Sequence, residues 1–221
     1  MIGSNKCKWC GQGIDDCIGY CLKCRGIELR YNDLPCFYKI MLDKQYIDNA
    51  GNKEARDGCK QFTQEDDPRG VILSGNAGTG KTHLAVKTYY DLLVQRQKDI
   101  MLIGTSELLL DIRNCFNKNS ETNELDVIEK YAAYKYLFLD DFGAEKISEF
   151  VIETFYMIID TRYRNYKHKL FITTNLEIRE LAKKFGDRIA SRLMEMCRVY
   201  TIIGEDYRLK TENNIKGKAE S

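Results

Sequence analysis

Short runs of consecutive apolar residues recur along the chain from about residue 70 onward, and polar or glycine residues follow each run. A strand that is covered on both faces of a parallel sheet gives such a continuous run, whereas a half-buried strand alternates apolar and polar positions. We therefore expect a parallel sheet with strands at 71–73, 100–103, 136–139, 170–174 and 199–203.

Between these runs, apolar residues recur at intervals of three and four, which is the period of an amphipathic helix. Alternating strand and helix patterns indicate an α/β fold. A short amphipathic stretch also lies at 37–46, with Phe37, Ile40, Met41 and Tyr46 as its apolar residues. Thr105 or Ser106 is the expected cap of one helix. We expect helices at 52–61, 82–94, 105–116, 125–134, 147–166 and over the segment that contains 188–192.

Composition fits a folded domain with a small appendage. The chain has 221 residues, of which 43% are hydrophobic and 30% charged, so it can bury a core. The net charge of +1 gives no indication for or against nucleic acid. No apolar run is long enough for a membrane span, and the first residues lack the apolar core of a secretory signal. We therefore expect a cytoplasmic protein without membrane contact.

The stretch after the first predicted strand matches the phosphate-binding loop pattern G-x-x-x-x-G-K-[ST]. Glycines allow successive backbone N–H groups to converge on phosphate oxygens, and the helix that follows adds the positive end of its dipole. In this pattern the lysine binds the β- and γ-phosphates and the threonine hydroxyl ligates Mg²⁺. The eight residues are Gly75, Asn76, Ala77, Gly78, Thr79, Gly80, Lys81 and Thr82.

Two carboxylates, Asp140 and Asp141, follow the apolar run at 136–139. Ligands of open α/β sheets bind at the carboxyl ends of the strands, where these side chains would emerge. We expect Asp140 to hold Mg²⁺ and Asp141 to orient an attacking water. A strand end with two solvated acids is the alternative, and the pairing with the loop at 75–82 favours the functional interpretation.

Polar and basic residues near the C-terminus are further candidates. Asn175 ends the fourth predicted strand at the same edge and could bind the γ-phosphate or the water. Arg188 and Arg192 are four residues apart and share one helix face. They are either a solvent-facing pair or a fork aimed at phosphate. The basic run at 162–169 favours a solvated helix end, and a contact for DNA or an acidic partner is the alternative.

Five of the nine cysteines lie within the first 24 residues. Two C-x-x-C pairs separated by ten residues predict a four-thiolate zinc site, and Cys17 could replace one of the four ligands or stay free. Reduced thiols on a tail and a redox pair are the alternatives. The expected ligands are Cys7, Cys10, Cys21 and Cys24. The scattered cysteines, expected to be small buried hydrophobes, are Cys36, Cys59, Cys115 and Cys197.

Taken together, these motifs resemble the AAA+ ATPases of the bacterial helicase-loader class, the DnaC and DnaI proteins and their phage relatives, over residues 35–208. The transposition ATPase IstB is similar over the same core. The resemblance implies an AAA+ domain with a five-stranded parallel sheet that binds ATP. It also implies that Asn175 is sensor 1, that Arg192 is an arginine finger acting on a neighbouring subunit with Arg188 beside it, and that Arg208 is the sensor 2 arginine.

The same resemblance implies the biological role. A zinc module would grip a replicative ring helicase, and the ATPase domain would load that helicase onto single-stranded DNA. Many AAA+ enzymes have Glu where this chain has Asp141, so we expect slow hydrolysis that works as a switch. An IstB-like ATPase assisting a transposase and a nucleotide-gated zinc adaptor with little hydrolysis are the alternatives. The expected division is 1–30 for the zinc module, 31–69 for a connector, 70–208 for the ATPase and 209–221 for a disordered tail.

Overall fold

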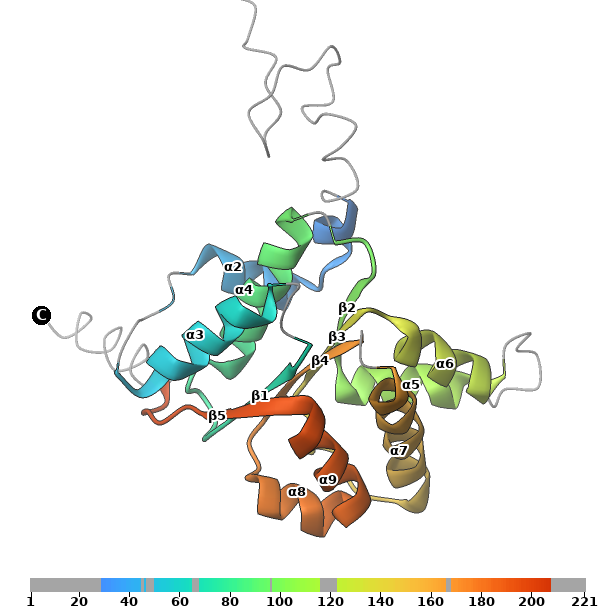
Figure 1. Cartoon of the computed structure of the whole chain (residues 1–221). Helices are drawn as coiled ribbons and strands as arrows, with labels where there is room; N and C mark the ends of the chain where they lie inside the picture. The colour runs from blue at the N-terminus through green and yellow to red at the C-terminus, as the bar shows by residue number, and fades with distance from the viewer. Residues whose placement is uncertain are drawn as a thin grey trace, which may run out of the picture.

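Figure 1 shows the computed structural model of the chain, in which helices surround a central sheet. The expected zinc ligands, Cys17, Arg208 and the expected tail lie outside the residues that the structure describes. Those residues are 29–44, 46, 50–64, 68–95, 97–115, 123–165 and 168–207.

The sheet has five strands in the order β2-β3-β4-β1-β5, and each neighbouring pair is parallel. This confirms the expected α/β fold with a five-stranded parallel sheet. The first four strands lie where the apolar runs predict them. The last strand begins two residues earlier than expected and ends before Ile202. The bounds are β1 Gly70–Ser74, β2 Ile100–Gly104, β3 Tyr136–Asp140, β4 Lys169–Thr174 and β5 Cys197–Thr201.

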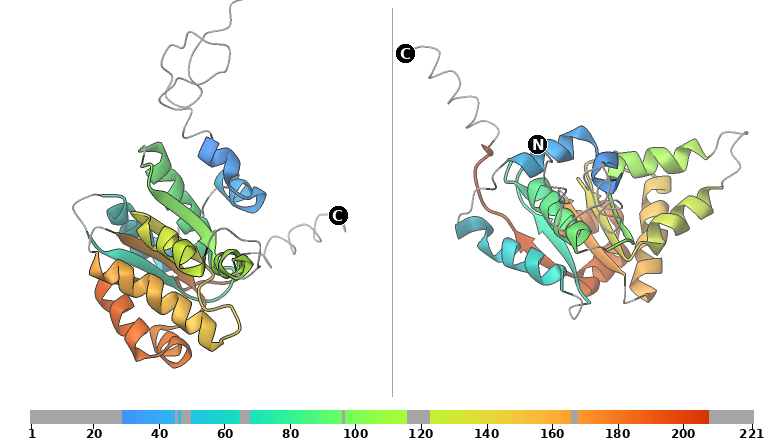
Figure 2. Two further views of the ribbon diagram at one scale, coloured as in Figure 1. Left: turned by 90° about the vertical axis from the view of Figure 1, so that its right-hand side faces the viewer. Right: turned by 90° about the horizontal axis from the view of Figure 1, so that it is seen from above.

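Helices cover both faces of the sheet, as the two rotated views in Figure 2 show. Helices α2 to α4 pack with one apolar cluster, and α5 to α9 pack with the other. Their bounds are α2 Cys36–Asp43, α3 Lys53–Phe62, α4 Lys81–Val94, α5 Thr105–Asn114, α6 Glu124–Ala133, α7 Glu149–Arg164, α8 Ile178–Phe185 and α9 Asp187–Met196. A short 3₁₀ turn, η1 Ala50–Asn52, precedes α3.

Successive strand residues contribute to opposite clusters, because side chains of a strand point alternately to the two faces. In β1, Val71 and Leu73 belong to the α2–α4 side, whereas Ile72 belongs to the α5–α9 side. At the end of α3, the ring of Phe62 packs edge-on against Phe138 and Phe171 at centroid distances of 5.5 and 5.2 Å. This aromatic contact anchors the end of α3 on β3 and β4, and the helix also packs against β1 and β5.

Two details differ from the expectations for the helices. The cap of α5 is Gly104, without a side-chain cap bond, because the Thr105 hydroxyl donates to the carbonyl of Asp141 instead. In α2, Phe37 and Ile40 are 55% and 48% exposed, and the buried residue is Tyr38. None of the helices within the described ranges combines the length and apolar character needed to cross a bilayer.

Candidate functional site

The loop between β1 and α4 has the backbone that a phosphate-binding loop requires. Gly78 and Gly80 adopt φ values of 75° and 92°, in the left-handed region that favours glycine. Gly80 is the N-cap of α4 and contributes no side chain to that helix end. The first N–H groups of α4 therefore remain available to an anion, which the helix dipole also favours.

Lys81 is buried, and its ammonium folds back onto this loop. Its Nζ donates to the carbonyl oxygens of Gly75 and Asn76 at 2.7 and 2.6 Å. The Thr79 hydroxyl also donates to the carbonyl of Asn76, at 2.9 Å. A positive charge is thus held next to the backbone groups at which phosphate oxygens bind in loops of this type.

Asp140 at the end of β3 joins the loop to the sheet. Its Oδ1 accepts hydrogen bonds from the Thr82 hydroxyl at 2.9 Å and from the Thr173 hydroxyl at 2.6 Å. Its Oδ2 accepts one from the Tyr38 hydroxyl at 3.3 Å. The structure therefore brings together the two residues that the sequence predicts as magnesium ligands.

Burial raises the pKa of the Asp140 carboxyl, and the nearby charge of Asp141 raises it further, whereas the hydrogen bonds from the Thr173, Thr82 and Tyr38 hydroxyls oppose this shift. The donor set fits Mg²⁺, which prefers oxygen ligands and keeps several waters. Within the described ranges, no group of three or more His, Cys, Asp or Glu side chains could hold a metal ion. Magnesium would therefore depend on Thr82, Asp140, water and the phosphates of a ligand.

Asp141 has a left-handed backbone with a φ of 56°, which is uncommon for a residue other than glycine. Its N–H donates to the Thr173 hydroxyl at 2.9 Å, and its carbonyl accepts from the Thr105 hydroxyl at 3.0 Å. Both contacts hold this conformation in place. Asp141 lines a cavity together with Asn175, the expected sensor, so both expected water-orienting side chains border the same space.

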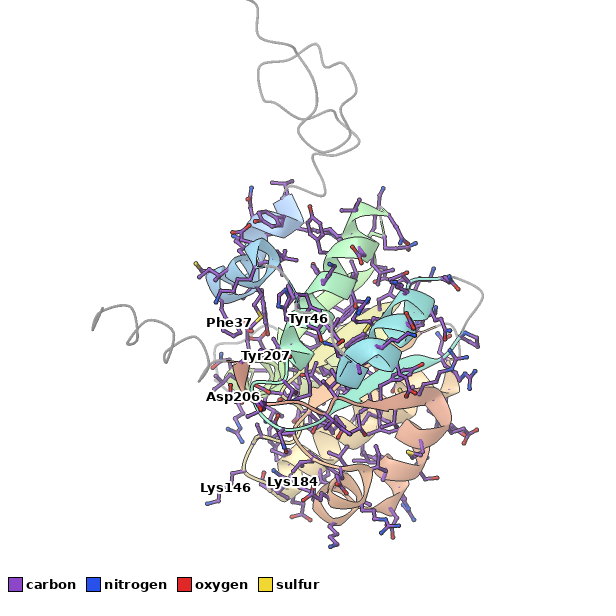
Figure 3. All side chains as sticks on the ribbon, turned by 90° about the vertical axis from the view of Figure 1, so that its left-hand side faces the viewer. Phe37, Tyr46, Lys146, Lys184, Asp206 and Tyr207 are labelled. Carbon is purple, nitrogen blue, oxygen red and sulfur yellow. The ribbon has the colours of Figure 1, made fainter. Side chains whose placement is uncertain are left out.

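This cavity has a volume of about 660 Å³. The loop residues 77–82 form one end, and mainly aromatic and apolar side chains together with that of Lys44 form the other. Figure 3 shows Phe37, Tyr46 and Tyr207 gathered between α2 and the loop end of the sheet. Met41 and His83 also line this end, where the Tyr46 and His83 rings meet edge-on at 5.1 Å.

The chain after β5 runs along the phosphate loop. The N–H of Ile202 donates to the carbonyl of Ser74 at 2.7 Å, and the N–H of Tyr207 donates to the carbonyl of Gly78 at 3.2 Å. Asp206 lies so close to Gly78 that a Cβ on that glycine would come within 1.8 Å of its Oδ1. The segment after β5 therefore reaches the cavity at Tyr207, which is the last residue described.

Arg192 does not line this cavity and instead packs within its own chain. Its guanidinium contacts Asp160 of α7 at 2.7 Å, although not as an aligned hydrogen bond. It also lies over the rings of Tyr156 and Tyr163, at 5.1 and 5.5 Å from their centroids. Arg188 is exposed on the same helix, one turn earlier. Within one chain, the described part of the structure does not bring these arginines to the nucleotide loop.

Several residues of the site were not predicted as such from the sequence. Tyr38 and Thr173 donate to Asp140, and Phe37, Met41 and Tyr207 form cavity wall. Thr173 precedes the strand end that the sequence does indicate, so its position carries a signal. Phe37 and Tyr207 carry no such signal. Nothing in their local sequence pattern shows that α2, the phosphate loop and the chain after β5 meet at one cavity.

Comparison with known proteins assigns this chain to a protein family. The family model described as IstB-like ATP binding protein matches residues 43–215, which is most of the chain and includes the whole loop and both carboxylates. The chain belongs to the family of IstB-like ATP-binding proteins. The resemblance deduced from the motifs is thereby confirmed at the level of the family.

Individual relatives of this IstB-like chain include two kinds of protein. The replicative helicase loader DnaC of Escherichia coli (strain K12) is 26% identical over 161 residues, which span 72% of this chain and 64% of the relative's length. The ATP-binding protein of insertion sequence IS232 from Bacillus thuringiensis is 27% identical over 145 residues, which span 63% of this chain and 56% of the relative.

The fold of the IstB-like chain is also that of a solved loader. The crystal structure of the DnaC helicase loader superposes with a TM-score of 0.63 at 26% identity, covering 76% of this chain and 100% of the other. The similarity therefore extends from the family motifs to the arrangement of the AAA+ sheet and its helices.

Proposed function

We propose that this protein is an ATPase that loads a replicative ring helicase onto single-stranded DNA. The contact between Thr82 and Asp140 is the main support for ATP binding. It joins the start of α4 to the end of β3 at 2.9 Å, next to the buried ammonium of Lys81. The likeness to DnaC in sequence and fold supports the loading role.

In this proposal the loop residues 75–80 cradle the phosphates through their backbone N–H groups. Lys81 would exchange the carbonyls of Gly75 and Asn76 for phosphate oxygens, and Thr82 with Asp140 would hold Mg²⁺. The metal supplies charge neutralisation at the phosphates. The aromatic end of the cavity takes the base, since a purine packs well against flat apolar side chains such as Phe37 and Tyr46.

Hydrolysis would be a direct attack by water, with positioning and electrostatic stabilisation doing the catalytic work. Asp141 and Asn175 border the cavity and would orient the water and the γ-phosphate. The carboxylate of an aspartate reaches less far than that of a glutamate. Slow hydrolysis that a partner stimulates is therefore the expected behaviour, and it suits a switch better than a motor.

The arginines would act when copies of the chain assemble. Arg192 is the proposed trans finger that reaches the nucleotide of the adjacent subunit, with Arg188 beside it. Arg208, the residue after the cavity-lining Tyr207, is the proposed sensor 2 arginine in the same subunit. ATP would thus promote self-association, and self-association would promote hydrolysis.

In this proposal, the N-terminal module that contains the cysteines contacts the helicase. Four thiolates from Cys7, Cys10, Cys21 and Cys24 would bind Zn²⁺ in a module of about 30 residues, joined by a connector to the ATPase domain. Such a small segment needs metal binding to fold. The ATPase domain would contact the single-stranded DNA.

The proposal is tested by native mass spectrometry of the full chain with the replicative helicase of its host, with and without ATP and Mg²⁺. We expect a complex of defined stoichiometry, and ATP should change the amount formed or the number of loader copies. The Lys81→Ala variant should remove the response to ATP. Absence of any complex with the helicase under all conditions would exclude the loading role.

The relative from insertion sequence IS232 favours a second candidate, an ATPase that assists a transposase. A pull-down that offers helicase and transposase in competition separates the two roles. The nucleotide-gated adaptor is tested with Asp141→Asn, which should stop turnover without removing ATP binding. Unchanged helicase loading by this variant would favour the adaptor over the hydrolytic switch.

A further inference from the structure

The Tyr38 hydroxyl contacts the carboxylate of Asp140 across 102 residues of sequence. Tyr38 lies on α2, is 6% exposed, and donates to Oδ2 at 3.3 Å. Asp140 is 5% exposed at the end of β3. The hydrogen bond from this buried hydroxyl can orient the carboxylate of the expected magnesium ligand, which packing of the ring alone would not do.

The three hydroxyl groups around Asp140 donate unequal numbers of hydrogen bonds to its two carboxylate oxygens. Oδ1 accepts two hydrogen bonds, from Thr82 and Thr173, whereas Oδ2 accepts one, from Tyr38. Each carboxylate oxygen has two lone pairs, so Oδ2 retains one acceptor position. Donors on both oxygens also prevent the carboxylate from rotating. The remaining lone pair therefore has a fixed direction.

The same helix borders the nucleotide cavity. Phe37 and Met41 line the cavity, while Tyr38 is a buried member of the apolar cluster on the α2–α4 side and reaches Asp140 with its hydroxyl. Helix α2 packs mainly on α4, the helix that begins with Lys81 and Thr82. Its N-terminus at Pro35 has no side-chain cap bond, so tertiary packing must supply much of what holds α2 in place.

We propose that Tyr38 is a positioning residue for Asp140, and that it makes the Mg²⁺-dependent part of nucleotide binding depend on the docking of α2. This inference rests on the proposed function, since it concerns the same nucleotide site. Hydrogen-bond partners of metal ligands orient those ligands, and their loss costs roughly 10- to 100-fold in metal affinity. Conversely, Mg²⁺ and ATP together would hold α2 against α4.

The test is calorimetry of the full chain with a non-hydrolysable ATP analogue, once with Mg²⁺ and once with a chelator. Tyr38→Phe removes the hydroxyl and keeps the ring. We expect it to reduce the gain in affinity that Mg²⁺ provides by about tenfold, while the affinity for the metal-free analogue stays as in the wild type. Tyr131→Phe is the matched control, because it removes a hydroxyl that donates to Asp111 at 2.5 Å, on the α5–α9 side of the sheet.

A second variant tests the role of helix docking without touching the hydroxyl. Leu34→Ala removes a buried side chain of the cluster that contains Tyr38 and Leu84, and should likewise lower the gain from Mg²⁺. Thermal unfolding of each variant reports its stability separately. An unchanged gain from Mg²⁺ in Tyr38→Phe overturns the inference, and so does an equal loss of affinity with and without metal. If the wild type binds no analogue at all, the proposed function fails instead.

Discussion

Asp160 on α7 and Arg192 on α9 form an ion pair of 2.7 Å within a single chain. The guanidinium is further held over the rings of Tyr156 and Tyr163, and 23% of the Arg192 side chain stays exposed. An arginine that is fixed in this way loses little conformational freedom when it meets an anion. If Arg192 is the trans finger that we propose, its own chain would hold it in position for the nucleotide of a neighbour.

From this relationship we predict that Arg192→Ala lowers the ATP turnover of the assembled protein by at least about 10³-fold, the lower end of the range for arginine fingers. The affinity of the isolated chain for ATP should not change, because Arg192 does not line its own cavity. Turnover and calorimetry measure the two quantities. Arg164→Ala is the control, since Arg164 also contacts Asp160 but is 75% exposed and should leave turnover near the wild-type value. Equal turnover in both variants would contradict the role.

For the phosphate loop, we predict that Lys81→Ala weakens ATP binding by about 10- to 100-fold, which corresponds to the loss of charged hydrogen bonds. Calorimetry with Mg²⁺ present measures the effect. Lys87→Ala on the exposed side of α4 should bind ATP as the wild type does. Similar affinity in the Lys81 and Lys87 variants would show that the loop does not hold phosphate through this ammonium.

Gly78 should tolerate no side chain. A Cβ at this position would meet the Asp206 carboxylate at 1.8 Å, and φ is 75°. We predict that Gly78→Ala lowers the free energy of unfolding by about 1–3 kcal/mol, as expected for a strained backbone, and that it also weakens ATP binding. Thermal unfolding and calorimetry measure both effects. Adding Asp206→Ala should restore part of the loss, because it removes the clash but not the backbone strain. No restoration would mean that the two residues are not in contact.

The cysteines of the described residues should differ in reactivity. Burial raises the pKa of the Cys59 and Cys197 thiols to about 12, so roughly one molecule in 10⁴ carries either thiolate at pH 8. Cys36 is exposed. We predict that iodoacetamide labels Cys36 first and labels Cys59 and Cys197 only after unfolding by guanidinium, as measured by peptide mass spectrometry. Rapid labelling of Cys59 in the native protein would contradict the packing of α3.

At the N-terminus, we predict one zinc ion per chain by elemental analysis. Replacing any of Cys7, Cys10, Cys21 or Cys24 by serine should lower that content and weaken helicase binding, whereas ATP binding is retained. Cys17→Ser is the matched control and should keep the metal. Full zinc content in a Cys10→Ser variant, with loss in Cys17→Ser, would move Cys17 into the ligand set.

The elements nearest the nucleotide site were predictable from local pattern. Continuous apolar runs located the buried strands because each is covered on both faces, and the glycines at 75–80 marked the turn between β1 and α4. Asp140 could be predicted because it directly follows the apolar run at 136–139, and it is the last residue of β3. The bounds of β5 were predicted two residues too late, since its apolar run continues into Ile202, whose N–H still donates to the carbonyl of Ser74 although β5 has ended.

Contacts between distant segments could not be predicted in this way. Arg162 lies in a basic run and was interpreted as part of a solvated helix end, yet it is fully buried. Its guanidinium donates to the carbonyls of Ala132, Tyr134, Lys135 and Lys169. Those carbonyls flank the starts of β3 and β4, so the position of Arg162 depends on the assembled sheet rather than on its own helix.

Strand β1 lies between β4 and β5 in the sheet. The phosphate loop therefore follows a strand whose two neighbours, β4 and β5, each lie about 4.8 Å away in the sheet. The chain after β4 leads to Asn175, and the chain after β5 leads to Tyr207. In the proposed cycle, a displacement of the loop on exchange of triphosphate for diphosphate would reach both neighbouring strands through the hydrogen bonds that β1 makes with β4 and β5. Under the proposed function, the nucleotide state would thus be relayed over a single strand spacing to the segments that lead to Asn175 and Tyr207.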